Sequence, residues 1–126
     1  MPLTKLTARK LNPEELQELI SEVTRPLKQL RGLTKIILFG STLRAGFSEA
    51  SDLDFVLIFK SKEEAKGAQK EVYRVHSGKW PCDFICVDNA TYEERSDLGG
   101  ICHVAKHEGK TIYPPWKPRR TVSQKI

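Results

Sequence analysis

Apolar and polar residues alternate with a helical spacing near the start of the chain. Residues 12–15, Asn-Pro-Glu-Glu, have the cap residue, the proline and the acids that are typical of a helix start. Apolar side chains then recur at helical spacing, which predicts an amphipathic helix over residues 13–30 that Gly32 ends. Pro26 lies inside this segment and is expected to kink the helix.

The next apolar segments have the composition of β-strands. Short apolar runs at residues 34–39, 53–59 and 82–87 predict three strands, the first of them buried. Residues 111–113 form a candidate edge strand at the end of the patterned part of the chain.

Two helical segments separate these strands. Ser61 and the acids that follow it form a capping sequence for a helix that closes at Gly78. The last helical segment begins at Thr91, is weakened by the pair Gly99-Gly100 and ends at Gly109.

Strands thus alternate with helices along the whole pattern, which predicts an α+β (α/β) fold. We expect a mixed sheet of three to four strands with helices packed on it. The chain has 126 residues, enough to bury one core but not two. We therefore assign residues 1–113 to a single domain and residues 114–126, which are basic and Pro-rich, to a loosely ordered tail.

The composition and the termini indicate a cytoplasmic protein without a membrane partner. No apolar run approaches the roughly 18 residues that a membrane-spanning helix needs. The first residues lack the continuous apolar segment of a secretory signal. Three cysteines, Cys82, Cys86 and Cys102, have no spacing typical of a secreted disulfide framework, so reduced thiols are expected.

The net charge of +5 is a weak argument for binding to nucleic acid. The last ten residues contain four cations and no acid, namely Lys117, Arg119, Arg120 and Lys125. Removing these four from the 21 basic residues leaves 17 against 16 acidic ones, so the folded part is nearly neutral. A solvated basic tail explains the charge. Trp116 within the tail could stack on a base, but an anchor that docks the tail is the favoured interpretation.

Asp52 and Asp54 are the first candidates for chemistry. Residues two apart in a strand point to the same face, so both carboxylates project together from the start of the strand at 53–59. Two adjacent carboxylates repel each other, and a bound divalent cation removes that penalty. Ligands that are all oxygen favour a hard ion such as Mg²⁺. The alternative is a pair of solvated acids at the strand entrance.

The residues upstream favour a ligand that carries phosphates. Gly40 ends a strand and allows a ligand to approach the backbone, and Ser41 begins a turn that can lead into a helix with free amides. Ser41 also adds a hydroxyl donor, and Arg44 is near enough in sequence to reach the same anion. Asp83 supplies a third carboxylate if its strand lies beside the strand that carries Asp54. Together these residues predict a site for a nucleoside triphosphate.

This arrangement resembles the signature of a known superfamily. Gly40-Ser41, ten residues and then Asp52-x-Asp54 are similar to the Gly-Ser-x(10)-Asp-x-Asp signature of the DNA polymerase β-like nucleotidyltransferases. The resemblance covers roughly residues 34–113 and looks most like the minimal nucleotidyltransferase branch, which includes antitoxin partners of HEPN-type toxins. One departure is visible, because the family often has Gly-Ser-x-Ala-Arg-Gly where this chain has "GSTLRAG".

The resemblance implies a role for each candidate residue. Asp52 and Asp54 would hold two Mg²⁺ ions that bridge the triphosphate, and Gly40 and Ser41 would hold its phosphates. Asp83 would bind the catalytic metal and help to activate the attacking hydroxyl. The implied reaction moves a nucleoside monophosphate to a hydroxyl acceptor and releases pyrophosphate, and the family's habit makes ATP the expected donor. Two metal ions can stabilise both the entering and the leaving oxygen of such a displacement.

An interaction protein is the alternative to an enzyme. An antitoxin can use this fold to bind and neutralise a partner, and a HEPN-type partner or a second copy of the chain could also complete an acceptor site. Catalysis needs Asp52, Asp54 and Asp83, whereas a binding module tolerates their loss. The presence of all three favours the enzyme.

Two other sets of residues are weaker candidates for a site. His103 and His107 are four apart on an expected helix, which is a zinc-ligand spacing, but no further ligand pattern accompanies them. Asp88 is an alternative third carboxylate. It follows Asp83 by five residues, an odd number, so a regular strand places it on the opposite face.

Overall fold

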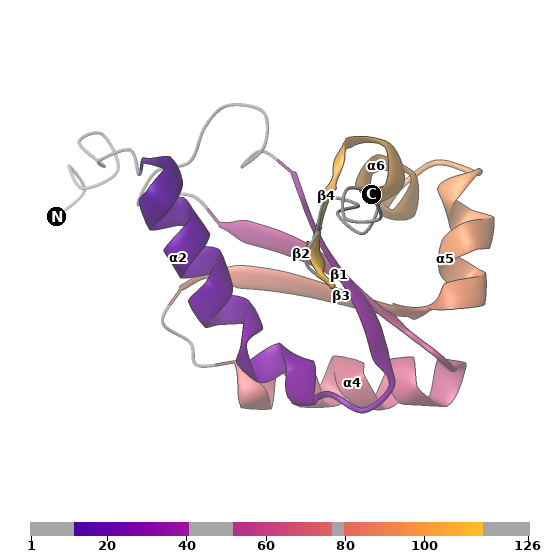
Figure 1. Cartoon of the computed structure of the whole chain (residues 1–126). Helices are drawn as coiled ribbons and strands as arrows, with labels where there is room; N and C mark the ends of the chain where they lie inside the picture. Colours follow the sequence, from indigo (N-terminus) through magenta and orange to yellow (C-terminus); the bar gives the residue numbers. More distant parts are fainter. Residues whose placement is uncertain (1–11, 41–51, 77–79, 115–126) are drawn as a thin grey trace, which may run out of the picture.

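The computed structural model describes residues 12–40, 52–76 and 80–114. Its centre is a four-stranded sheet with the strand order β3-β2-β1-β4 (Figure 1). β2 and β3 are parallel, and β1 is antiparallel to both β2 and β4. The strand bounds are β1 Leu33–Phe39, β2 Leu53–Phe59, β3 Cys82–Asp88 and β4 Lys110–Tyr113. This mixed sheet, with helices packed on it, confirms the predicted α+β architecture.

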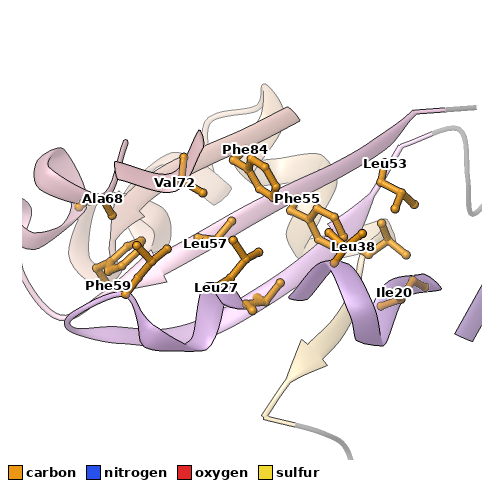
Figure 2. Close-up of a cluster of buried hydrophobic side chains, with 14 residues drawn as sticks. Ile20, Leu27, Leu38, Leu53, Phe55, Leu57, Phe59, Ala68, Val72 and Phe84 are labelled. Carbon is orange, nitrogen blue, oxygen red and sulfur yellow. The ribbon is translucent and has the colours of Figure 1, made fainter. Parts of the chain in front are cut away.

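One face of the sheet is covered by the helices that precede β3 in the chain. These are α2 (Pro13–Thr24), the short 3₁₀ helix η1 (Pro26–Gln29) and α4 (Lys62–Val75), which connects the parallel strands β2 and β3 (Figure 1). Alternate strand residues face these helices because a strand has a period of two. Figure 2 shows the resulting core, in which Phe55 and Phe59 of β2 lie among side chains of α2, η1, α4 and β3.

The opposite face is covered by α5 (Asn89–Ser96) and α6 (Ile101–Glu108). The remaining alternate residues of the sheet, such as Val56 and Ile58 of β2, pack against these two helices. β2 is therefore buried on both faces, which explains why its sequence is apolar throughout apart from Asp54.

The prediction of one helix over residues 13–30 is wrong for its last third. The α-helix ends at Thr24, and the chain continues from Pro26 as the 3₁₀ helix. Proline has no backbone N–H to donate to the α-helical ladder, and its ring clashes with the preceding turn. Pro26 therefore ends the α-helix instead of kinking it.

The predicted helix from Thr91 to Gly109 is in fact two helices. Gly99 and Gly100 have φ angles of 105° and 83°, which no α-helix accommodates, and they separate α5 from α6. The start is also earlier than predicted. The carboxylate of Asp88 accepts a hydrogen bond from the Thr91 backbone N–H at 3.1 Å, so Asp88 is the cap and Thr91 lies inside α5.

Several predicted features fall outside the described residues. These are Ser41, Arg44, Gly78 and the basic tail after Pro114. In the described segments, no helix is both long enough and apolar enough to cross a membrane.

Candidate active site

Two carboxylates face each other where β2 and β3 begin. The parallel register of these strands places Asp54 directly opposite Asp83. β1 runs in the other direction, so its last residue, Phe39, pairs with Asp54, and Gly40 follows at the same edge of the sheet. The pairing of three strands thus brings together residues that are 43 positions apart in the sequence, from Gly40 to Asp83.

The strand periodicity also puts these carboxylates on one face. Asp54 and Asp83 alternate with Phe55 and Phe84, which point into the core beneath α2 and α4, so they share the face that α5 and α6 cover. Asp52 immediately precedes β2 and is close enough for its charge to act on Asp54. Asp54 is half-buried, whereas Asp52 and Asp83 are exposed. A ligand from solvent can therefore reach all three.

Gly40 is required at this edge for two structural reasons. Its φ angle is 94°, in the region that residues with a Cβ rarely adopt. A Cβ built on Gly40 would also lie 2.6 Å from Oδ2 of Asp54, well inside van der Waals contact. The missing side chain lets the backbone turn away from β1 directly beside the carboxylate.

Replacing Gly40 by Ala should destabilise the protein by about 1–3 kcal/mol, the cost of a strained backbone residue. The new methyl group would in addition displace the Asp54 carboxylate. Gly67→Ala is the matched control, because Gly67 lies within α4 with no atom within 4 Å of an added Cβ. Helix propensity predicts that this control stabilises the protein by up to about 1 kcal/mol. Urea denaturation of both variants tests the pair, and equal effects would refute the special role of Gly40.

The carboxylates create a negative field at the sheet edge. Partial burial raises the pKa of Asp54, and the charges of Asp83 and then Asp52 raise it further, together with a hydrogen bond to the Asp83 side chain. The pKa of the neighbouring Cys82 thiol is raised as well. Burial, followed by the charges of the three aspartates, raises the pKa of Cys82 to about 12, so this thiol stays protonated at neutral pH.

The raised pKa of Asp54 predicts a stability that depends on pH. An acid whose pKa rises on folding destabilises the folded state once it ionises, and that cost vanishes as pH falls below the ordinary carboxyl pKa of about 3.9. Without divalent cations, Asp54→Asn should therefore melt at a higher temperature than the wild type at pH 7. The difference should shrink as the pH is lowered towards 4. Thermal melting in EDTA tests this, and a variant that melts below the wild type at pH 7 would contradict it.

The donor atoms at this edge fit a hard divalent cation. All three side chains offer carboxylate oxygens, which Mg²⁺ prefers. Among the described residues, no group of three or more carboxylate, imidazole or thiol side chains is placed so that it could hold a metal ion by itself. Mg²⁺ commonly uses only one or two protein carboxylates and completes its shell with water and substrate phosphates. The pair Asp54 and Asp83, with Asp52 beside it, is sufficient for this kind of coordination.

Side chains of α4 hold β3 at its outer edge. The Gln69 side-chain amide donates to the Phe84 carbonyl at 3.0 Å and accepts from the Cys86 N–H at 2.9 Å. The Tyr73 hydroxyl accepts from the Phe84 N–H at 3.0 Å. These bonds satisfy backbone groups that would otherwise be unpaired on an outer strand. They also hold the strand immediately after Asp83.

Gln69 and Tyr73 were not identified from the sequence. Their spacing of four residues does place them on one side of a helix. The spacing does not show which strand the two side chains contact, because that contact depends on the path of α4 between β2 and β3.

Asp88, the alternative third carboxylate, lies at the other end of β3 from Asp83. It is 7% exposed and caps α5 through the Thr91 backbone N–H. Hydrogen bonding to Thr91 lowers the pKa of Asp88, so the group stays ionised as a structural cap.

The histidine pair does not form a metal site with any other described side chain. The rings of His103 and His107 lie 4.4 Å apart, centre to centre. His103 Nδ1 lies 2.8 Å from the Ser96 carbonyl oxygen, which links α6 to the end of α5. All three cysteines are free thiols, as predicted.

The fold and the position of the carboxylates can be compared with known families. A nucleotidyltransferase domain family matches residues 20–109, a range that contains Gly40 and the three aspartates. No curated protein shows a significant match to the chain. The family comprises transferases that act on nucleotides and typically depend on a metal ion. Since the match spans more than two thirds of the sequence, the chain belongs to the nucleotidyltransferase domain family.

Proposed function

We propose that this protein transfers a nucleoside monophosphate from a nucleoside triphosphate, with ATP as the favoured donor, to a hydroxyl acceptor. The acceptor hydroxyl releases its proton to solvent as its oxygen forms a bond to the α-phosphorus, the bond from that phosphorus to the bridging oxygen breaks, and pyrophosphate leaves with the electron pair. One observation carries the proposal. Asp54 and Asp83 lie opposite each other on one face, beside the turn at Gly40.

Each residue contributes to this reaction through its position. Asp52 and Asp54 would hold two Mg²⁺ ions together with the triphosphate, and Asp83 would join them as a ligand of the catalytic ion. When bound, these ions neutralise charge on the phosphates and lower the pKa of the acceptor hydroxyl. Asp83 is exposed, so an acceptor hydroxyl can approach its carboxylate and be oriented by it.

Phosphate binding is assigned to the turn that follows β1. Gly40 has no side chain to cover the backbone, and its positive φ turns the chain at the edge where the carboxylates lie. Ser41 is the next residue in the sequence and Arg44 comes three residues after it, and their hydroxyl and guanidinium groups suit the triphosphate oxygens.

A partner-dependent role is the second candidate, and exposed apolar side chains favour it. Leu98 is 78% exposed and Ile101 is 44% exposed, on either side of the glycines that separate α5 from α6. Such side chains suit a protein partner that supplies the acceptor or, in the case of an antitoxin, is itself neutralised. Partner binding of this kind would survive the loss of Asp52 and Asp54.

Calorimetric titration with the four ribonucleoside triphosphates, with and without Mg²⁺, tests the proposed donor site. We expect binding that requires Mg²⁺ and that Asp52→Asn/Asp54→Asn abolishes. Glu94→Gln/Asp97→Asn is the matched control, since it removes two exposed acids from α5 and its C-terminal end and should bind like the wild type. Absence of Mg²⁺-dependent binding in the wild type would overturn the proposal for the isolated chain.

A further inference from the structure

A second candidate site lies between α2 and β4, on the face of the sheet opposite to Asp54 and Asp83. It is a groove with a volume of about 420 Å³, within the size range of pockets that take small molecules. The groove is lined by Gln17, Ile20, Ser21, Thr24, Arg25, Lys28, Lys110, Thr111 and Ile112. None of these residues belongs to the proposed donor site, so the groove is a separate candidate for ligand binding.

The charged residues that line this groove are all cations. Arg25, Lys28 and Lys110 are exposed at its rim, and no carboxylate is among the lining residues. Within the described chain, none of the three forms a salt bridge. The Lys28 ammonium is held 5.3 Å from the centre of the Tyr113 ring, a contact that fixes its position and leaves its N–H groups available.

Neutral donors accompany the cations. The Gln17 amide and the Ser21 hydroxyl line the groove on the side of α2, and neither has a side-chain hydrogen bond within the described chain. β4 lies opposite them and is the outer strand of the described sheet, so alternate backbone groups of β4 point away from β1. Ile20 and Ile112 supply apolar surface between the two sides.

The concentration of positive charge is local. The larger groove between η1 and α4 is lined by Glu63, Glu64 and Glu71 and by only one cation, Arg31. An anion is therefore favoured between α2 and β4 and disfavoured in the larger groove. The acids and the cations thus line different grooves, and the groove between α2 and β4 is the one of these two that suits an anion.

We propose that the groove between α2 and β4 binds the phosphoryl groups of a small phosphorylated ligand. Three cations that form no salt bridge within the described chain suit the charge of a diphosphate, whereas a single carboxylate would leave at least two of them uncompensated. Arg25 can bind two phosphate oxygens at once, and the two lysines act as point charges beside it. This site is separate from the proposed donor site and does not depend on the carboxylates or on Mg²⁺.

Calorimetric titration with inorganic pyrophosphate in EDTA tests the proposal. We expect binding by the wild type and at least a tenfold weaker affinity in Arg25→Gln/Lys28→Gln/Lys110→Gln. The matched control is Lys60→Gln/Lys66→Gln/Lys70→Gln, which removes the same charge from exposed positions outside the groove and should stay within about twofold of the wild type. EDTA removes the divalent cations that the proposed donor site requires, so the titration reports on the groove between α2 and β4.

Two further measurements complete the test. A conservative variant separates loss of binding from misfolding, and a second probe identifies the source of the phosphates. Arg25→Lys keeps the charge but loses the bidentate geometry of the guanidinium, so its affinity should fall between those of the wild type and the triple variant, and thermal melting checks that it is folded. A short single-stranded oligonucleotide shows whether the phosphates come from nucleic acid: binding that the groove variant loses would support the phosphate chemistry with that source. Equal losses in the groove and control variants, no binding of either probe, or tighter binding of an acidic peptide would each overturn the proposal.

Discussion

Replacing Asp83 by Asn is expected to lower nucleotidyl transfer roughly 1000-fold while nucleotide binding changes little. Metal-ion catalysis contributes several kcal/mol, and each 1.36 kcal/mol of lost transition-state stabilisation is tenfold in rate. Asp83 lies opposite Asp54 but on the neighbouring strand, so its loss leaves Asp52 and Asp54 to hold the triphosphate. Asn keeps the shape of the side chain and removes the charge that would hold the catalytic ion.

Pyrophosphate release from ATP and Mg²⁺, with glycerol supplied as a surrogate hydroxyl acceptor, measures the transfer. Calorimetric titration of the same variant separates binding from the chemical step. Asp97→Asn is the control, because Asp97 is an exposed acid at the end of α5 and should leave the rate unchanged. An Asp83→Asn variant with full activity would remove Asp83 from the mechanism.

The largest stability effect is expected from Phe55→Ala, at about 3–5 kcal/mol. Phe55 is 0% exposed and stacks on Phe84 with ring centres 5.7 Å apart, at the centre of the core shown in Figure 2. A domain of this size has a total stability of about 5–15 kcal/mol, so the variant would be near its unfolding limit at room temperature.

Urea denaturation of Phe55→Ala, with Leu98→Ala as the control, measures this loss. Leu98 is 78% exposed, and its truncation should change the free energy of unfolding by no more than about 0.5 kcal/mol. Similar losses in the two variants would contradict the assignment of Phe55 to the main core.

The sequence was most informative where local chemistry and hydrophobic pattern agreed. Asn12 caps α2 in a capping box with Glu15, as its sequence predicts, with hydrogen bonds of 2.8 and 3.0 Å. Ser61 likewise accepts from the Glu64 N–H at the start of α4. These interactions span only three residues, so the sequence alone contains all their partners.

Helix ends were less well predicted where a proline or a glycine pair ends a helix although the apolar spacing continues past it. The apolar spacing of residues 13–30 continues through Pro26, but the α-helical ladder does not. The pair Gly99-Gly100 likewise ends one helix and precedes another, because both residues adopt positive φ. Periodicity describes which side chains can be buried, whereas backbone geometry decides where a helix stops.

The sequence by itself determined the four strands and their order along the chain, the starts of α2 and α4, and the close spacing of Asp52 and Asp54 at the beginning of β2. Only the tertiary structure decided that Asp83 lies opposite Asp54, that Gly40 turns the chain beside them, and that Gln69 and Tyr73 of α4 hold β3. The physical reason is the range of the interactions. Caps and alternation act over a few residues, but strand register depends on burying both faces of the sheet at once.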